Sequence, residues 1–200
     1  MSNFPTYTDN WVLLFSIGGI MDFRTLRGNY QENSIAQAIE REFPEAKVFM
    51  SFRVYDEYSH KPVEIDILVV SEFGVYSIES KRVKGAVYGE EYDEKWIIKQ
   101  HRNGMIPIEN PVRQNEKHIR AINTALKIRN LPKLDMLQNI VCVSLSGNVR
   151  VYTDSLKVYT LPELLYKLKT DRNIFQLQNK RVNVELICKL LEKIRYRTNE

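Results

Sequence analysis

The stretch VEIDILVVSEFGVYSIESK, residues 63–81, contains two apolar runs separated by a short break with one glycine. Such runs of Val, Ile and Leu around a break are typical of two antiparallel strands joined by a tight turn. Four charged residues lie near the outer ends of these runs: Glu64, Asp66, Glu79 and Lys81. Because charged side chains cost free energy in an apolar hairpin, this pattern indicates a site that needs them.

The register of the hairpin decides whether these charges meet. Alternate residues of a strand share a face, so Glu64 lies on the side of Asp66, and Glu79 on the side of Lys81. A loop of two or four residues places Asp66 opposite Glu79 and Glu64 opposite Lys81, with Cβ atoms roughly 4.5 to 5.5 Å apart. A three-residue loop shifts the register and sends Asp66 and Glu79 to opposite faces.

Two opposed carboxylates require a positive charge between them, because their burial and repulsion cost on the order of several kcal/mol. One source is Lys81, in a cross-strand cluster of ion pairs at a solvent-facing edge. The other is a divalent cation, and ligation by carboxylate oxygens favours magnesium or manganese over zinc. The sequence leaves both the ion-pair cluster and the metal site open. The surrounding Val, Ile and Leu residues are more typical of the wall of a cleft than of a solvent-facing edge.

Composition describes one soluble domain, since the 200 residues are 44% hydrophobic and 27% charged. The 29 Lys and Arg against 25 Asp and Glu give a net charge of +4, which permits a nucleic-acid partner without requiring one. Cys142 and Cys188 are far apart and show no metal-like spacing. We therefore expect no disulfide scaffold, no zinc site and a reducing cytoplasmic location.

The N-terminus carries an apolar run, WVLLFSIGGI, at residues 11–20. It is about half the length of a membrane span and lacks the basic start and cleavage site of a signal peptide. We therefore expect no transmembrane segment and an extension, residues 1–27, that packs on a domain of residues 28–200. A peripheral membrane contact or an oligomer interface, such as that of a homodimer, is the alternative.

Hydrophobic periodicity predicts the order of the other elements. A helix is expected over residues 30–43 and ends before Pro44. Asn110 and Pro111 read as the N-cap and first position of a helix that reaches Ile128. The remaining expected elements are strands at 47–54, 95–100 and 139–145, a turn at 102–104, and helices around 161–169 and 184–196. This order predicts an α/β fold in which helices flank both faces of a mixed sheet.

The hairpin contains an aspartate, then a break with a glycine, then the motif Glu-x-Lys. This order resembles the core of the PD-(D/E)xK nuclease superfamily, with Asp66, Glu79, Ser80 and Lys81 at the core positions. More narrowly, the chain resembles a nuclease-related (NERD) domain over about residues 28–195. The matching pieces are GNYQE (28–32), EIDILVV (64–70), GVYSIESK (74–81), Gly85, Trp96, NPVRQNEKHI (110–119) and NIVCVSL (139–145). The resemblance implies a restriction-endonuclease-like fold with a mixed central sheet flanked by helices.

The resemblance also implies a chemistry. Asp66, Glu79 and the backbone carbonyl of Ser80 would hold a magnesium or manganese ion, while Lys81 would orient or help deprotonate the attacking water. Such nucleases often place an apolar residue at position 80, so the serine puts packing in question more than catalysis. The implied activity is a metal-dependent nuclease, acting on DNA more than on RNA. The alternative is an inactive nucleic-acid-binding or scaffold module that recruits a DNA-processing protein.

Two further residues are candidates for the site. Glu32 continues the helical stripe of Ala36 and Ile39, which points it toward the site. In the competing reading it closes a capping box with Asn29 as N-cap, and the resemblance favours the site. The family pattern retains Gln114, which we expect to contact the active site or a substrate phosphate. For His118 the two readings are a proton carrier and a packing or surface residue; we expect the second, which is the more frequent role of a lone histidine on a helix.

A basic stripe offers a contact for the phosphate backbone of DNA. Its members are Lys84 beside the hairpin, and Arg113, Lys117 and Arg120 on one face of the helix from Pro111. Such a stripe gives binding that depends on salt and hardly on sequence. The alternative is the solvated face of an amphipathic helix.

Overall fold

The computed structural model describes residues 23–100, 104–144, 149–179 and 181–197. Its helices are α1 (Phe23–Glu42), α2 (Pro111–Ile128), α3 (Leu161–Leu177) and α4 (Val184–Ile194). Its strands are β1 (Lys47–Asp56), β2 (Lys61–Ser71), β3 (Gly74–Ser80), β4 (Ala86–Tyr88), β5 (Lys95–Gln100), β6 (Gly104–Glu109), β7 (Leu137–Ser144), β8 (Arg150–Tyr152) and β9 (Val158–Thr160). The apolar run at 11–20 lies outside the described residues.

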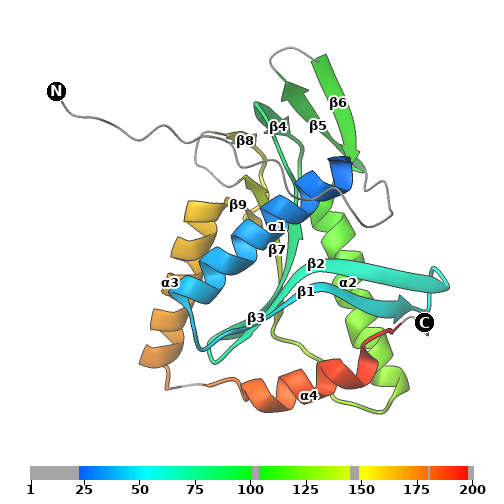
Figure 1. The fold of residues 1–200 in the computed structure, drawn as a ribbon, viewed down its shortest axis with the longest axis vertical. Helices are drawn as coiled ribbons and strands as arrows, with labels where there is room; N and C mark the ends of the chain where they lie inside the picture. Colours follow the sequence, from blue (N-terminus) through cyan, green and yellow to red (C-terminus); the bar gives the residue numbers. More distant parts are fainter. Residues whose placement is uncertain (1–22, 101–103, 145–148, 180, 198–200) are drawn as a thin grey trace, which may run out of the picture.

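A five-stranded sheet in the order β1-β2-β3-β7-β9 forms the centre of the fold (Figure 1). The pairs β1–β2 and β2–β3 are antiparallel, whereas β7 runs parallel to both β3 and β9. Helices α1 and α3 pack on one face of this sheet, and α2 and α4 pack on the other. This arrangement confirms the predicted α/β class and the restriction-endonuclease-like mixed sheet flanked by helices.

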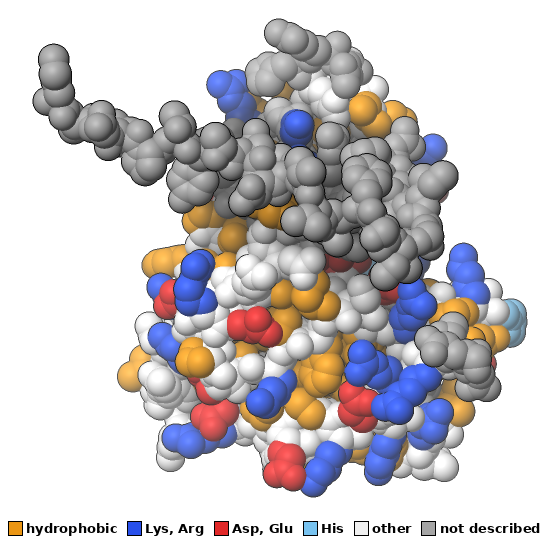
Figure 2. Space-filling view, in the orientation of Figure 1, with side chains coloured by type: hydrophobic (Ala, Val, Ile, Leu, Met, Phe, Trp, Pro, Cys, Tyr) orange, Lys and Arg blue, Asp and Glu red, His pale blue; other side chains and the backbone are white. Residues whose placement is uncertain are grey.

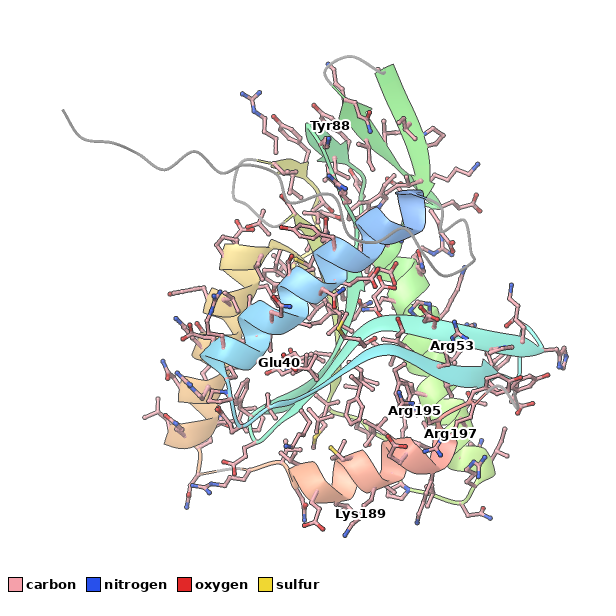
Figure 3. The ribbon with its side chains drawn as sticks, viewed as in Figure 1. Glu40, Arg53, Tyr88, Lys189, Arg195 and Arg197 are labelled. Atoms are coloured by element: carbon pink, nitrogen blue, oxygen red, sulfur yellow. The ribbon has the colours of Figure 1, made fainter. Side chains whose placement is uncertain are left out.

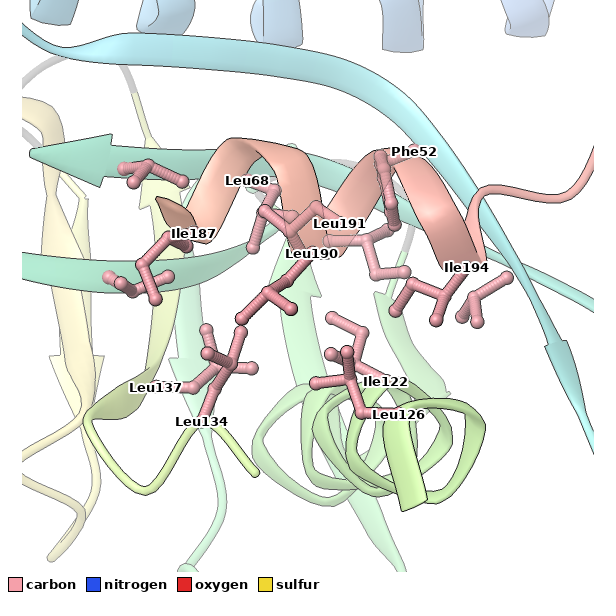
Figure 4. Packing of buried hydrophobic residues seen from close by; sticks show 14 of the residues in the cluster. Phe52, Leu68, Ile122, Leu126, Leu134, Leu137, Ile187, Leu190, Leu191 and Ile194 are labelled. Carbon is pink, nitrogen blue, oxygen red and sulfur yellow. The ribbon is translucent and has the colours of Figure 1, made fainter. Parts of the chain in front are cut away.

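Helix α4 lies at the bottom of the molecule in Figure 1, and Figure 4 shows how its apolar side chains pack. It presents a stripe of Ile187, Leu190, Leu191 and Ile194 at helical spacing, and all four are buried. Across from them lie residues of β1, β2, α2 and the segment before β7: Phe52, Leu68, Ile122, Leu126, Leu134 and Leu137. The apolar contacts join the C-terminal helix to the strands that carry the site.

The β2–β3 hairpin has a two-residue loop, and its register is the one that brings the charges together. Ser71 pairs with Gly74, and Ile67 pairs with Ile78. The ladder ends at this pair; beyond it the Ser80 amide donates a hydrogen bond to Asp66 Oδ2 over 2.8 Å, so Asp66 lies beside the end of β3. Glu79 lies on the face of β3 that packs against α2, because its alternate neighbours Val75 and Ser77 are on that side.

A second sheet, in the order β6-β5-β4-β8, projects from the top of the molecule (Figure 1). Only the strand at 95–100 was expected here, because β4 and β8 are three residues long and show no readable alternation. Val87, Trp96 and Ile98 bury the inner face of this sheet against the start of α2 and the end of β7. Gly85, with φ at 105°, turns the chain from β3 into this sheet.

Helix α1 begins at Phe23, so the capping-box reading of Glu32 is wrong. Asn29 lies inside the helix and cannot be its N-cap. Gly28 lowers the helix propensity of this segment, which is why the pattern indicated a later start. None of the described helices is both long and apolar enough to cross a membrane.

The predicted start of α2 is confirmed. The Asn110 side-chain oxygen accepts hydrogen bonds from the amides of Val112, at 2.9 Å, and Arg113, at 3.3 Å. The expected buried strand is confirmed as β7, which lies between β3 and β9. Residues 102–103 and Leu145, which belonged to an expected turn and strand, lie outside the described residues.

Candidate active site

Glu79 lies at the centre of the candidate site, with 1% of its side chain exposed. One oxygen, Oε1, accepts a hydrogen bond from Lys81 Nζ at 2.5 Å. The other, Oε2, is buried and has no hydrogen-bond partner among the described residues. Burial, and then the charge of Asp66, raise the pKa of Glu79 to about 7. Only one of the two oxygens of the Glu79 carboxylate therefore has a hydrogen-bond partner among the described residues.

Asp66 is held in place by the backbone of the opposite strand. Its Oδ2 accepts a hydrogen bond from the amide of Ser80 at 2.8 Å. Burial raises the pKa of Asp66, and this hydrogen bond opposes the shift. Ser80 thus has a defined part in the site through its N–H, whereas a metal-ligating role for its carbonyl stays a prediction.

Glu32 approaches the same place from α1, on the other side of the hairpin. Burial, followed by the charges of Asp66 and Glu64, raises the pKa of Glu32 to about 7, while Lys81 lowers it. Since the coupling of charges falls off with distance, these effects locate Glu32 close to the other carboxylates. The position favours the site reading of Glu32.

Glu64 does not lie opposite Lys81, contrary to our expectation. The β2–β3 ladder ends at Ile67 and Ile78, and Glu64 pairs instead with Arg53 of β1, whose Nε lies 2.7 Å from Glu64 Oε2. Lys81 is consequently free of Glu64 and turns to Glu79. Strand β1, which pairs with the other edge of β2, supplies this partner, Arg53. The sequence of the hairpin alone could not predict it.

His118 belongs to the site, although we expected a packing or surface residue. It is buried on α2, and its Nδ1 lies 3.5 Å from Glu79 Oε2. Neither atom has a hydrogen-bond partner among the described residues. Burial, and then the charge of Lys81, lower the pKa of His118 to about 4. At neutral pH the imidazole is therefore uncharged, and the contact is no ion pair. The signal in the sequence was the spacing of four residues between Gln114 and His118, which places both side chains on one side of the helix.

Gln114 is half-buried on α2, one turn before His118. Its side chain makes no hydrogen bond to any other residue that the structure describes. The residue that ties α2 to β3 and β7 is its neighbour Asn115, which is buried and bonded to Ser77, Asn139 and Ile140. The role of Gln114 stays a prediction.

The carboxylates fit a divalent cation. Their oxygens are the donors that magnesium and manganese prefer, and the free Oε2 of Glu79 lacks a positive partner. Raised pKa values at Glu32, Asp66 and Glu79 show that added positive charge would stabilise their ionised forms. Within the described ranges, however, no three Asp, Glu, His or Cys side chains converge closely enough to bind one ion as they stand.

The four basic residues predicted to bind phosphate are all exposed. Lys117 Nζ lies 2.6 Å from a carboxylate oxygen of Glu109, and Arg120 stacks over the ring of Tyr58 at 4.7 Å. Arg113 donates weakly to the carbonyl of Tyr92, at 3.4 Å, and Lys84 has no partner among the described residues. Three of the four cations already have a partner.

Another group of basic side chains lies on the lower right of the face in Figure 2. Figure 3 places Arg53, Arg195 and Arg197 in this region. Each is paired with a carboxylate: Arg53 with Glu64, and the other two with Glu192. Its charge is therefore largely neutralised, and this region is a weaker candidate for a phosphate contact.

Comparisons with known proteins agree with this geometry. A family model described as the nuclease-related domain matches residues 27–144. An uncharacterized protein of Bacillus anthracis is 35% identical over 89 residues, which are 44% of this chain and 41% of that protein. The chain thus matches about two fifths of the length of that relative. No solved structure matches significantly.

The match to the family model covers more than half of the chain, and it includes most of α1, the β2–β3 hairpin and all of α2. These elements supply Glu32, Asp66, Glu79 and His118. The chain therefore belongs to the nuclease-related domain (NERD) family, within the PD-(D/E)xK-like nuclease superfamily.

Proposed function

We propose that this chain is a metal-dependent nuclease that hydrolyses phosphodiester bonds of DNA. The observation that carries the proposal is the buried carboxylate of Glu79, whose Oε2 has no hydrogen-bond partner among the described residues. Asp66 and Glu32 lie close enough to raise its pKa further. A buried carboxylate in this state costs free energy, which a bound cation would recover.

Asp66 and Glu79 would hold the magnesium or manganese ion, with the carbonyl of Ser80 as a further oxygen donor and Glu32 reaching it directly or through water. When bound, the ion supplies positive charge that offsets the charge of a phosphodiester transition state and lowers the pKa of nearby water. The amide of Ser80 keeps Asp66 in position for this role.

Lys81 brings a positive charge to the mouth of the site. Its side chain is 27% exposed, so its ammonium group can turn from Glu79 toward a substrate. There it would donate to a phosphate oxygen, or orient and help deprotonate the attacking water. Gln114, at the start of α2, would contact a neighbouring phosphate from the helix N-terminus.

The exposed cations Lys84, Arg113, Lys117 and Arg120 support a nucleic-acid substrate. Contacts of this kind recognise phosphates and position a strand, and they carry no sequence information. We therefore assign DNA cleavage with little sequence preference.

A scaffold module without catalysis is the second candidate, and a specific observation favours it. Lys81 already lies 2.5 Å from Glu79, and no three potential ligands in the described residues converge on one point. In this reading the ion pair replaces the metal, and the fold recruits a DNA-processing protein.

The deciding experiment incubates the purified protein with circular and linear DNA, single- and double-stranded, and with RNA. Each reaction contains magnesium, manganese or a chelator. Glu79→Gln and Lys81→Ala are compared with two surface controls, Glu72→Gln in the exposed hairpin turn and Lys189→Ala on α4.

The nuclease proposal expects metal-dependent cleavage of DNA by the parent and both controls, and strongly reduced cleavage by the two site variants. Cleavage in no condition, or equal cleavage by Glu79→Gln and the parent, would overturn it. Salt-dependent binding of DNA without any cleavage would establish the scaffold reading.

A further inference from the structure

The outer face of the small sheet carries two exposed tyrosines that stack on each other. Tyr88 of β4 and Tyr152 of β8 are directly paired in the parallel ladder. Their rings are coplanar within 2°, with centroids 4.6 Å apart. Tyr88 is 38% exposed and Tyr152 is 49% exposed. Figure 3 shows Tyr88 on the part of the molecule that projects above the main sheet.

The strand pairing shows which residues share this face. Val87 lies between Ala86 and Tyr88 and points inward to the buried cluster with Trp96 and Ile98. The outer face is therefore formed by alternate residues of the four strands, paired across the sheet in rows. We call this face the tyrosine platform; it consists of Tyr152, Tyr88, Ile97 and Pro107 in one row, Arg150, Ala86, Lys99 and Met105 in the next, and Lys95 with Glu109 at the end.

The tyrosine platform is positively charged. Lys95, Lys99 and Arg150 are exposed, and none of them pairs with an acidic side chain of the described residues. The one acidic residue of the platform is Glu109, whose carboxylate is bound to Lys117 at 2.6 Å. Aromatic rings and uncompensated cations thus occupy the same surface.

The platform borders the candidate active site. Glu109, at the end of β6, lies near enough to Lys81 and His118 for their charges to lower its pKa, after the larger effect of Lys117. Tyr88 follows Lys81 by seven residues, which limits their separation to about 25 Å. The end of the platform at Glu109 therefore lies near the site, and Tyr88 lies at most about 25 Å from Lys81.

We propose that the tyrosine platform binds single-stranded nucleic acid, with a base stacked on the outer ring face of Tyr152. Strand β8 is the edge of the small sheet, so no strand of the described residues pairs beyond it, and Tyr152 is 49% exposed. Bases stack on exposed aromatic rings whatever their sequence, and cations along the same surface follow the phosphates. The proposal rests on the proposed function and deepens it, because it assigns a single-stranded segment to the substrate beside the cleaved bond.

A second copy of the chain is a poorer occupant of this face. In a two-fold symmetric dimer the same patch meets itself, so Lys95, Lys99 and Arg150 of both copies would lie in one interface. Their repulsion opposes such a contact, whereas a phosphate backbone neutralises it.

Binding is measured by fluorescence anisotropy with a labelled oligothymidine of about 20 nucleotides, longer than a typical single-strand site. A duplex of the same length is the second probe. All proteins carry Glu79→Gln, and a chelator is present, so that no cleavage interferes. Tyr152→Ala and Tyr152→Phe are compared on this background with Tyr166→Ala, which removes a tyrosine on α3 that is more exposed than Tyr152.

We expect Tyr152→Ala to weaken single-strand binding by roughly 5- to 100-fold, the loss of one stacked base. Tyr152→Phe keeps the ring and should bind like the background protein, as should Tyr166→Ala. Duplex binding should change much less. Circular dichroism and thermal unfolding confirm that each variant is folded.

The proposal is overturned if Tyr152→Ala binds the single strand as well as Tyr166→Ala, or if duplex binding falls equally. It is also overturned if sedimentation shows a dimer that Tyr152→Ala converts to a monomer, because a second copy then occupies the face. These outcomes are separate from the nuclease proposal. If the protein cleaves duplex DNA but binds no single strand, the nuclease proposal stands and the proposal for the tyrosine platform is wrong.

Discussion

Asn115 of α2 is joined to Ser77 of β3 by two reciprocal hydrogen bonds. Ser77 Oγ donates to Asn115 Oδ1 over 2.6 Å, and Asn115 Nδ2 donates to the Ser77 carbonyl over 2.7 Å. Ser77 precedes Glu79 by two residues on the same face of β3, and Asn115 lies one turn before His118 on α2. This pair therefore sets how closely the helix brings His118 to Glu79.

We predict that Asn115→Ala destabilises the protein by about 2–4 kcal/mol, because it leaves buried polar groups of Ser77 and Asn139 unpaired. It should also lower any cleavage rate, since α2 is no longer fixed against β3. Urea unfolding and the cleavage assay check both effects. Asn173→Ala, at an exposed position of α3, is the control and should change stability by less than about 0.5 kcal/mol. Equal stability of the two variants would show that the pair does not anchor the helix.

Much of this arrangement follows from the sequence of one hairpin. The two-residue loop and the alternation in β2 and β3 determine the strand pairing as far as Ile67 and Ile78, which brings Asp66 and Glu79 to the end of the ladder. The hydrogen bond from Ser80 to Asp66 and the closeness of His118 to Glu79 depend on how separate elements pack, and no local pattern encodes them. Glu64 was misassigned for the same reason, since its partner Arg53 comes from β1.

The small sheet shows a different limit. Strands β4 and β8 have three residues each, which is too short for an alternation to be recognised. Val87 of β4 and Val151 of β8 pack in a core with Trp96 of β5 and with α2 and β7, and this packing holds the short strands in place. The stacking of Tyr88 on Tyr152 joins residues far apart in the chain, so only the structure could reveal it.

Glu79→Gln should change stability in a manner that depends on pH. The pKa of Glu79 in the folded protein is about 7, above its ordinary value of 4.5. The folded state therefore binds the proton more tightly, and metal-free protein loses stability as pH rises from about 4.5 through about 7. Glutamine removes this loss.

For this variant we expect a free energy of unfolding close to that of the parent near pH 5, and about 1–3 kcal/mol higher near pH 8. Urea unfolding with a chelator measures the difference, with Glu72→Gln as the exposed control. A variant that is less stable than the parent at both pH values would contradict the raised pKa.

Magnesium should stabilise the folded protein most at alkaline pH. Protons compete with the ion for Glu32 and Glu79, whose pKa values are both raised to about 7. At a concentration of 100 times Kd the ion adds about 2.7 kcal/mol to the free energy of unfolding. We expect thermal scans to show a rise in Tm near pH 8 that is much smaller near pH 5. The rise should vanish in Asp66→Asn; an equal rise in that variant would place the ion elsewhere.

Gly85→Ala should be more destabilising than Gly104→Ala. Both glycines have positive φ, at 105° and 72°, so alanine is strained at either position by about 1–2 kcal/mol. At Gly85 the new Cβ would also approach the backbone carbonyl of Lys99, whereas at Gly104 it meets open space. The first variant should detach β4 from β5 and add to the loss measured by urea unfolding. Equal losses would mean that the backbone at Gly85 shifts without cost.

The salt dependence of duplex binding should distinguish Arg113 of α2, which has no carboxylate partner among the described residues, from Lys117, which is paired with Glu109. Each phosphate contact contributes about 0.9 to the slope of log affinity against log salt. Arg113→Ala should remove roughly one such contact, because Arg113 holds only a weak bond to the Tyr92 carbonyl. Lys117→Ala should change the slope less, since Glu109 already neutralises Lys117. Glu109→Gln should therefore strengthen binding and steepen the slope by releasing Lys117. Lys189→Ala on α4 is the control, and an equal loss in that variant would show that the protein binds DNA by its overall charge.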